Sequence, residues 1–214
     1  MTVKKSLLSV KNLCFRRDDT DILRAICLNI NEGEVLQIEG VNGSGKTTLL
    51  RLLTSALSPS EGSIHFCGKP LTDCRFDYLS SILFLGHQSA VKMGLTAEEN
   101  LAWMSGLMEH SHSIACALEA FDLKGYSDIP CHRLSAGQQR RVALARLMLS
   151  NVKIWYLDEP FAALDTQGCT LVEQCMQRHI NGGGAVVLST HQSVALESLR
   201  RYSLPALNQH ELYR

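Results

Sequence analysis

A glycine-rich stretch at residues 40–48 has the residue types and the spacing of a loop that holds phosphate groups. It fits the pattern G-x-x-x-x-G-K-[ST] and reads Gly40, Val41, Asn42, Gly43, Ser44, Gly45, Lys46, Thr47 and Thr48. In such a loop the backbone N–H groups point at phosphate oxygens, the lysine adds a positive charge, and the following hydroxyl can ligate Mg²⁺. An apolar segment at 35–38 precedes the loop, and leucines at positions 49, 50, 53 and 57 follow it at helical spacing. The sequence therefore predicts a site for a nucleoside triphosphate.

A pair of acidic residues follows a second apolar segment, at 154–157. Asp158 would lie at the end of the predicted strand, where it can hold Mg²⁺ through water. Glu159, one residue further on, can polarise the attacking water as a general base. An Asp-Glu pair after a strand is weak evidence by itself. Downstream of a phosphate-binding loop it predicts hydrolysis of the bound nucleotide.

A second candidate phosphate site lies at residues 134–142. Ser135 and Gln138 form an S-x-x-Q capping box, so a helix is expected to begin here. Its free N–H groups and positive dipole end would attract an anion, and Gly137 would let a phosphate approach closely. The alternative interpretation is a well-capped helix with a structural role.

The composition is that of an ordinary globular chain. Of the 214 residues, 45% are hydrophobic and 20% charged, and the formal net charge is zero, so no basic excess favours binding to nucleic acid. The eight cysteines contain no C-x-x-C pair, which favours reduced, mostly buried thiols over disulfides or a zinc or haem site. No segment approaches 18 uninterrupted apolar residues, so contact with a membrane would need a partner.

The hydrophobic pattern changes along the chain and predicts an α/β core with a helical insertion. Helical patterns cover 96–150 and 167–180, and the glycines at 182–184 are expected to end the second of these. Strand-like segments fall at 7–15, 26–30, 35–39, 63–66, 81–85, 153–157 and 185–189.

Taken together, these motifs resemble the ATP-binding cassette (ABC) family. The segment Leu134-Ser135-Ala136-Gly137-Gln138 is nearly identical to the family signature L-S-G-G-Q, and the motifs follow the family order over nearly the whole chain. The resemblance implies a P-loop NTPase (RecA-like) α/β core with an antiparallel β subdomain and an inserted α-helical subdomain. It also implies a single nucleotide-binding domain over 1–214, with its core at 1–88 and 152–214 and the helical subdomain at about 89–151.

The resemblance also implies roles for single residues. Gln88 matches the Q-loop glutamine that senses Mg²⁺ and the attacking water. Asp165 matches the D-loop that crosses the dimer interface, and His191 matches the switch histidine that contacts the γ-phosphate. The implied assembly is a homodimer in which each ATP lies between one copy's phosphate loop and the other copy's helix at Ser135. Either Arg17 or Phe15 could stack on adenine.

Within this family the chain resembles the ATPases of cytochrome c maturation over roughly residues 8–200. The likeness includes Gly86-His87-Gln88, Ile129-Pro130, the run from Ser135 to Leu147, and Asp158-Glu159-Pro160-Phe161. It implies an ATPase on the cytoplasmic face of a bacterial inner membrane that pairs with membrane subunits of the B and C types through a groove near Gln88 and 89–110. Hydrolysis would be coupled to haem export or to release of a haem chaperone.

Two alternatives remain at this point. The first is the ATPase of another exporter, for a lipid, a lipoprotein or a drug. The second is a soluble ABC protein of DNA repair or translation, for which the segment 96–150 is too short to hold a long coiled coil. His110, His112 and the pair Cys131-His132 give no support for direct haem binding by this chain.

Overall fold

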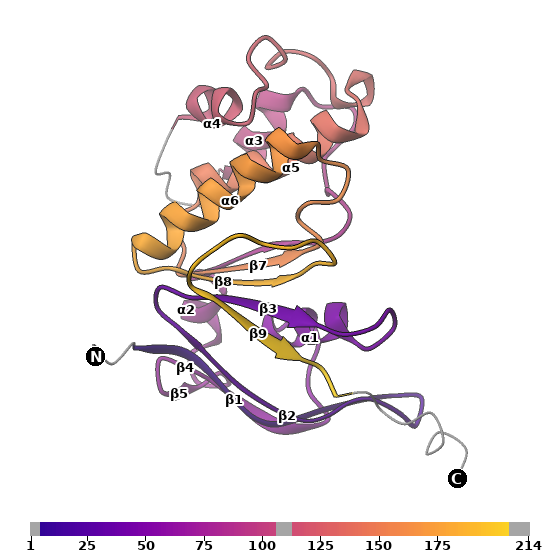
Figure 1. Cartoon of the computed structure of the whole chain (residues 1–214), viewed down its shortest axis with the longest axis vertical. Helices are drawn as coiled ribbons and strands as arrows, with labels where there is room; N and C mark the ends of the chain where they lie inside the picture. The colour runs from indigo at the N-terminus through magenta and orange to yellow at the C-terminus, as the bar shows by residue number, and fades with distance from the viewer. Residues whose placement is uncertain (1–4, 106–112, 206–214) are drawn as a thin grey trace.

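Two β-sheets form the framework of the computed structural model, which describes residues 5–105 and 113–205 (Figure 1). Within these residues the first sheet is antiparallel, with the strand order β2-β1-β4-β5. Its strands are β1 (Ser6–Arg17), β2 (Thr20–Asn31), β4 (Glu61–Phe66) and β5 (Lys69–Pro70). One face of this sheet packs on the core and the other is exposed, as the alternating burial of β2 indicates.

The second sheet is parallel, with the strand order β6-β7-β8-β3-β9 in the described residues. Its strands are β3 (Val35–Glu39), β6 (Ile82–Leu85), β7 (Ile154–Asp158), β8 (Ala185–Ser189) and β9 (Leu199–Ser203). Every residue of β7 and β8 is buried, as expected for parallel strands that are covered on both faces. Since the carboxyl ends of parallel strands meet at one edge, the loops after β3, β6, β7 and β8 gather there.

The helices cover both faces of the parallel sheet. Figure 1 shows α3, α4, α5 and α6 above this sheet, with α1 below it, toward the antiparallel sheet. Residues of β7 alternate between the two cores: Trp155 and Leu157 face the helices above, while Ile154 and Tyr156 join the core below. The helices are α1 (Lys46–Leu53), α2 (Arg75–Leu79), α3 (Ala97–Ser105), α4 (Ile114–Ala120), the 3₁₀ helix η1 (Cys131–Arg133), α5 (Ala136–Leu149) and α6 (Thr166–Asn181).

Most of the predicted elements are confirmed. Each predicted strand segment overlaps a strand, α6 matches the predicted helix at 167–180, and Gly182 is its C-cap. The short elements β5 and α2 and the edge strand β9 were not predicted. The helix after the phosphate loop ends at Leu53, so the extension of its leucine pattern to Leu57 was wrong.

The prediction that the cysteines are mostly buried was also wrong. Among the described residues Cys74, Cys131 and Cys175 are buried, Cys14 and Cys169 are half-buried, and Cys27, Cys67 and Cys116 are exposed. His110 and His112 lie outside the described residues. Within 5–105 and 113–205, no helix combines the length and the apolar character needed to cross a bilayer.

His179 in α6 is a half-buried titratable group that predicts acid sensitivity of the fold. Its ring stacks on Trp155 with centroids 3.9 Å apart and planes 5° from parallel. Burial lowers the pKa of His179 from 6.5 to about 4, because the charged form is desolvated. The neutral ring is therefore favoured in the folded chain. The stability linked to this site is complete above pH 6.5 and is lost as the pH falls toward 4.

When the pH is lowered from 7.5 to 5, we expect protonation of this histidine alone to lower the free energy of unfolding by about 2 kcal/mol. A His179→Phe variant keeps an aromatic ring against Trp155 and cannot take up a proton. Urea unfolding at both pH values should show a smaller loss for this variant than for the unaltered protein. Equal losses in the two proteins would contradict the assignment.

Candidate active site

The phosphate loop connects the end of β3 to the first turn of α1. Gly43 and Gly45 adopt φ of +82° and +94°, a region that favours glycine. A Cβ at Gly45 would also lie 2.9 Å from a methyl carbon of Leu23. Lys46 begins α1, and its Nζ donates to the carbonyl oxygens of Gly40 at 2.8 Å and Val41 at 3.2 Å. The loop thus closes on itself and leaves the first N–H groups of α1 facing it.

Asp158, at the end of β7, lies next to this loop. Asp158 as a whole is 3% exposed. One carboxylate oxygen accepts a hydrogen bond from Thr47 Oγ1 at 2.9 Å, and the other accepts one from Ser189 Oγ at 2.5 Å. A hydroxyl and a carboxylate are the oxygen donors that Mg²⁺ prefers, and Mg²⁺ is usually held by few protein ligands together with substrate phosphates. The residues present therefore fit this ion.

Glu159 and His191 follow the neighbouring strands β7 and β8. Glu159 has φ of +49°, which is unusual for a residue with a side chain. Its N–H donates to Ser189 O at 2.9 Å. Its Oε1 lies 3.6 Å from Nε2 of His191, whose side chain is 57% exposed. A carboxylate and an imidazole thus lie together at the carboxyl edge of the sheet.

A cavity of about 490 Å³ joins these groups. Its lining comes from the antiparallel strands β1 and β2, from the phosphate loop with the start of α1, and from the carboxyl ends of β6, β7 and β8 with the loops that follow them. The lining residues are Arg17, Ile22, Asn42, Gly43, Gly45, Lys46, Thr47, Thr48, His87, Asp158, Glu159 and His191. Gln88 lines an adjacent cavity of about 540 Å³ that shares Thr47, His87 and Asp158 with the first. Gly40 and Ser44 are absent from both linings and shape the loop, where Ser44 N–H donates to Val41 O at 3.1 Å.

The two candidates for the adenine contact lie in different surroundings. Arg17, at the end of β1, lines the cavity at the phosphate loop. Phe15 is half-buried and packs against the core below the parallel sheet. Arg17 is therefore the better-placed candidate for a contact with the base.

The second candidate phosphate site lies at the start of α5. The predicted capping box is confirmed: Ser135 Oγ accepts from Gln138 N–H at 3.2 Å, and Gln138 Oε1 accepts from Ser135 N–H at 2.9 Å. A Cβ at Gly137 would lie 3.1 Å from Ala163 O. Ser135, Gly137, Gln138 and Asp165 line a cavity of about 430 Å³ whose lining contains no residue of the phosphate loop. The two phosphate sites of one chain therefore open into separate cavities.

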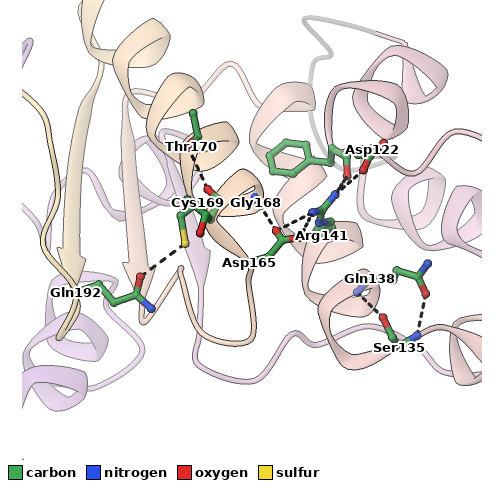
Figure 2. A network of polar contacts seen from close by, with 11 residues as sticks. Asp122, Ser135, Gln138, Arg141, Asp165, Gly168, Cys169, Thr170 and Gln192 are labelled. Carbon is green, nitrogen blue, oxygen red and sulfur yellow. Dashed lines mark hydrogen bonds and ion pairs between the residues drawn. The ribbon is translucent and has the colours of Figure 1, made fainter.

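Arg141 in α5 binds two carboxylates at the second site, those of Asp165 and Asp122 (Figure 2). Its side chain is 10% exposed and donates to both carboxylate oxygens of Asp165, at 2.8 and 3.1 Å, and to Asp122 at 3.1 Å. Asp165 is also the N-cap of α6 and accepts from Gly168 N–H at 2.8 Å. These bonds, the one from Gly168 first, lower the pKa of Asp165 because they favour the carboxylate. The carboxylate of Asp165 is thus engaged within its own chain.

Comparisons with known proteins agree with this geometry. The family model described as ABC transporter matches residues 23–162. The chain belongs to the ABC transporter family. As a member of this family, the chain is an ABC ATPase, which binds and hydrolyses ATP. The fold is accordingly the mixed α/β fold of ABC cassettes, as the resemblance of the motifs implied.

Curated relatives identify the branch of this ABC family. The chain is 47% identical over 189 residues to the "Cytochrome c biogenesis ATP-binding export protein CcmA" of Pseudomonas putida, covering 87% of this chain and 90% of the relative. The same-named proteins of Hahella chejuensis and Escherichia coli K12 are each 43% identical, covering 97% and 92% of this chain and 100% and 96% of theirs. The chain is thus a CcmA-type ABC ATPase.

Solved structures of ABC cassettes share the fold. The cassette MJ0796, described as dimeric in a post-hydrolysis state bound to ADP and Pi, has a TM-score of 0.80 and 28% identity to this chain. The match covers 92% of this chain and 94% of the cassette. A second dimeric structure of MJ0796 gives a TM-score of 0.79 with the same coverage.

Three residues of the candidate site, Ser189, Arg140 and Arg141, were given no role by sequence reasoning. Ser189 Oγ donates to the carboxylate of Asp158, and Ser189 O accepts from the N–H of Glu159. Arg140 in α5 donates to the carbonyl oxygen of His87, which precedes Gln88, and to that of Glu159. The helical spacing could have identified Arg140, because it lies three residues before Ala143 and four before Leu144, on the buried face of α5. A charged residue at a core-facing position of a helix needs polar partners inside the protein.

Proposed function

We propose that this chain is the ATP-hydrolysing subunit of a membrane ABC complex in cytochrome c maturation, which couples hydrolysis to haem export or to release of the haem chaperone. The observation that carries the proposal is the 43–47% identity to cytochrome c biogenesis ATP-binding export proteins over most of the chain. The site supports it, since each group needed for hydrolysis is present at the carboxyl edge of the parallel sheet.

In this proposal the phosphate loop and the residues beside it divide the work of hydrolysis. The N–H groups of the loop and Lys46 hold the phosphates. Thr47, Asp158 and Gln88 would hold Mg²⁺, which supplies charge neutralisation at the phosphates when bound. Glu159 accepts the proton of the attacking water. His191, beside Glu159, contacts the γ-phosphate.

The proposed catalytic unit is a homodimer with two composite sites. Ser135, Gly137, Gln138 and Asp165 of one copy would complete the site around the nucleotide on the other copy's phosphate loop. Two facts support this: the two phosphate sites of one chain line separate cavities, and the related MJ0796 cassette is described as dimeric with ADP and Pi. Hydrolysis would then depend on closure of the dimer, because neither copy alone stabilises the transferred charge.

The proposed membrane partners are subunits of the B and C types, bound at the surface near Gln88. Four residues after Gln88, Lys92 lies over the ring of Trp103, with Nζ 3.7 Å from the ring centroid. Met93 and Trp103 are 49% and 54% exposed, and such apolar groups on a surface suit a protein partner. The chain would lie on the cytoplasmic face of the inner membrane and be held there only through this partner. We expect no binding to nucleic acid. Residues 106–110 of the proposed groove lie outside the described residues.

The domain division also remains a proposal, with a core at 1–88 and 152–214 and a helical subdomain at about 89–151. In the described residues α3, α4 and α5 contact one another and cover one side of the parallel sheet (Figure 1). A rigid helical unit of this kind would carry the start of α5 toward the partner copy's nucleotide.

Complementation tests the proposed role. A bacterial strain that lacks its own cytochrome c biogenesis ATPase should regain covalently bound haem on its c-type cytochromes when it expresses this chain. Haem staining of denaturing gels measures the recovery, and the Lys46→Ala variant should not restore it. Failure of the unaltered chain to complement, together with capture of membrane subunits of a different exporter, would favour another cargo.

A further inference from the structure

Arg140 is a buried cation that joins three segments of the candidate site. Arg140 lies in α5 and is 3% exposed. One terminal nitrogen donates to the carbonyl oxygens of Gly86 at 3.0 Å and His87 at 3.2 Å. The other donates to the carbonyl oxygens of Asp158 at 3.3 Å and Glu159 at 2.7 Å. A single guanidinium thus spans the start of the segment that leads to Gln88 and the end of β7.

The cost of burying this charge is offset within the site. Burial lowers the pKa of Arg140, while the negative charges of Asp158 and Glu159 act in the opposite direction. Arginine stays protonated in proteins, so the cation persists. Its four hydrogen bonds among the described residues all go to main-chain carbonyls. An arrangement of this kind holds backbone in place, because each carbonyl must keep its position to satisfy the cation.

The backbone held at Glu159 is under strain. Its φ of +49° is unusual for a residue with a side chain. The peptide N–H is held by Ser189 O at 2.9 Å, and the carbonyl is held by Arg140 at 2.7 Å. With both ends fixed, the side chain is directed toward His191. Without the guanidinium, the carbonyl end would be free to relax.

We propose that Arg140 is a positioning residue for ATP hydrolysis, which orients Glu159 and the segment before Gln88 through their backbone. This inference rests on the proposed roles of Glu159 and Gln88. Arg140 acts without touching the nucleotide, since it is absent from the linings of the cavities at the phosphate loop and at Gln88.

The position of Arg140 in α5 also connects the two phosphate sites of one chain. Gln138, two residues earlier, belongs to the capping box that opens toward the second cavity. A shift of α5 caused by a nucleotide on the partner copy would therefore move the guanidinium and the carbonyls bound to it. Through this contact each copy's hydrolysing groups would respond to the nucleotide on the other copy.

The side chain must be arginine for this role. Its planar fork directs paired N–H groups at two segments at once, whereas lysine offers a compact charge with three donors on one atom. We therefore compare Arg140→Lys, which keeps the charge, with Arg140→Met, which keeps the apolar stem and loses every donor. Gln139→Ala is the matched control: Gln139 also lies in α5, and its amide donates to Cys131 O and Leu134 O.

Steady-state ATPase assays should separate the variants. We expect kcat to fall about 100-fold in Arg140→Met and about tenfold in Arg140→Lys, with KM for ATP within about threefold of the original, because misplaced catalytic groups slow the chemical step. Binding of a fluorescent ATP analogue and thermal unfolding are measured on the same samples. If Arg140→Met does not fold, the kcat of Arg140→Lys decides the question.

Two results would overturn the proposal. One is a kcat for Arg140→Lys that equals that of the unaltered protein. The other is an equal loss of kcat in Gln139→Ala, which would indicate general loosening of α5. Glu159→Gln is assayed in parallel: if that variant still hydrolyses ATP, the proposed function of Glu159 fails first, and the effect of Arg140 cannot then act through it.

Discussion

The Glu159→Gln variant is expected to bind ATP as the unaltered protein does and to hydrolyse it at least about 100-fold more slowly. Glutamine has nearly the same shape as glutamate, so the cavity that Glu159 shares with Lys46 and His191 keeps its form. An amide cannot accept a proton from water at neutral pH, and the general base is therefore lost. Binding depends mainly on the phosphate loop, which this substitution does not touch.

Phosphate release measures the turnover, and gel filtration with ATP and Mg²⁺ measures the assembly. Since the variant keeps ATP, it should elute as a dimer in ATP and as a monomer in ADP. Glu39→Gln is the matched control, because Glu39 ends β3 just before the phosphate loop and pairs with Arg201 at 3.3 Å. That control should retain most of the activity. Turnover by Glu159→Gln at the rate of the control would exclude Glu159 as the base.

Elements with a strong local signal could be predicted from the sequence. The capping box at Ser135 depends on residues three apart, and the buried strands β7 and β8 are continuous apolar runs. By contrast, β9 (Leu199–Ser203) carries two arginines and is only partly buried. It pairs with β3 at the edge of the parallel sheet. Its strand character comes from this long-range pairing, which local patterns do not encode.

The short elements escaped prediction for a different reason. The strand β5 has two residues and α2 has five, which is too short for a period of two or of 3.6 residues to repeat. The strand β5 exists only through its pairing with the neighbouring strand β4, at Phe66 with Lys69 and His65 with Pro70. The helix α2 is held by contacts to distant residues, since the hydroxyl of Tyr78 bonds to Leu53 O and to the hydroxyl of Tyr156. Such contacts exist only in the folded chain.

The residue types of the candidate active site could be picked out from the sequence, whereas the contacts between these residues could not. The motif order named Thr47 and Asp158, but the 2.9 Å bond between them joins residues 111 positions apart. The role of Arg140 is even harder to predict from a sequence pattern. Its partners are main-chain carbonyls that lie 53 and 54 positions before it and 18 and 19 positions after it. A carbonyl has no side-chain identity that a motif could record. The separation of the two phosphate sites likewise follows from the fold alone.

Because the two phosphate sites of one chain are separate, mixing two inactive variants is expected to restore ATPase activity. Lys46→Ala removes the cation of the phosphate loop, and Ser135→Asp places a carboxylate where the partner's phosphates would bind. Asp keeps the N-cap, because its side chain also accepts from the first turn of a helix. Each variant alone should lose at least about 100-fold in ATPase activity, since both composite sites of each homodimer are damaged.

Mixing restores one intact site in each mixed dimer. The Ser135→Asp copy supplies an intact phosphate loop, and the Lys46→Ala copy supplies an intact start of α5. Random pairing of equal amounts should recover up to about a quarter of the original activity, because half of the dimers are mixed and half of their sites are intact. The ATPase rate is measured as a function of the mixing ratio, with a maximum expected at equal amounts.

Ser135→Asn supplies the matched control for charge. Asparagine caps a helix as well as aspartate does and has nearly the same size, so this variant should keep far more activity than Ser135→Asp. The comparison separates repulsion between carboxylate and phosphate from damage to α5. If the mixture of Lys46→Ala and Ser135→Asp stays as inactive as its components, each copy must complete its own site. The two cavities of one chain would then have to serve a single nucleotide, which their separate linings argue against.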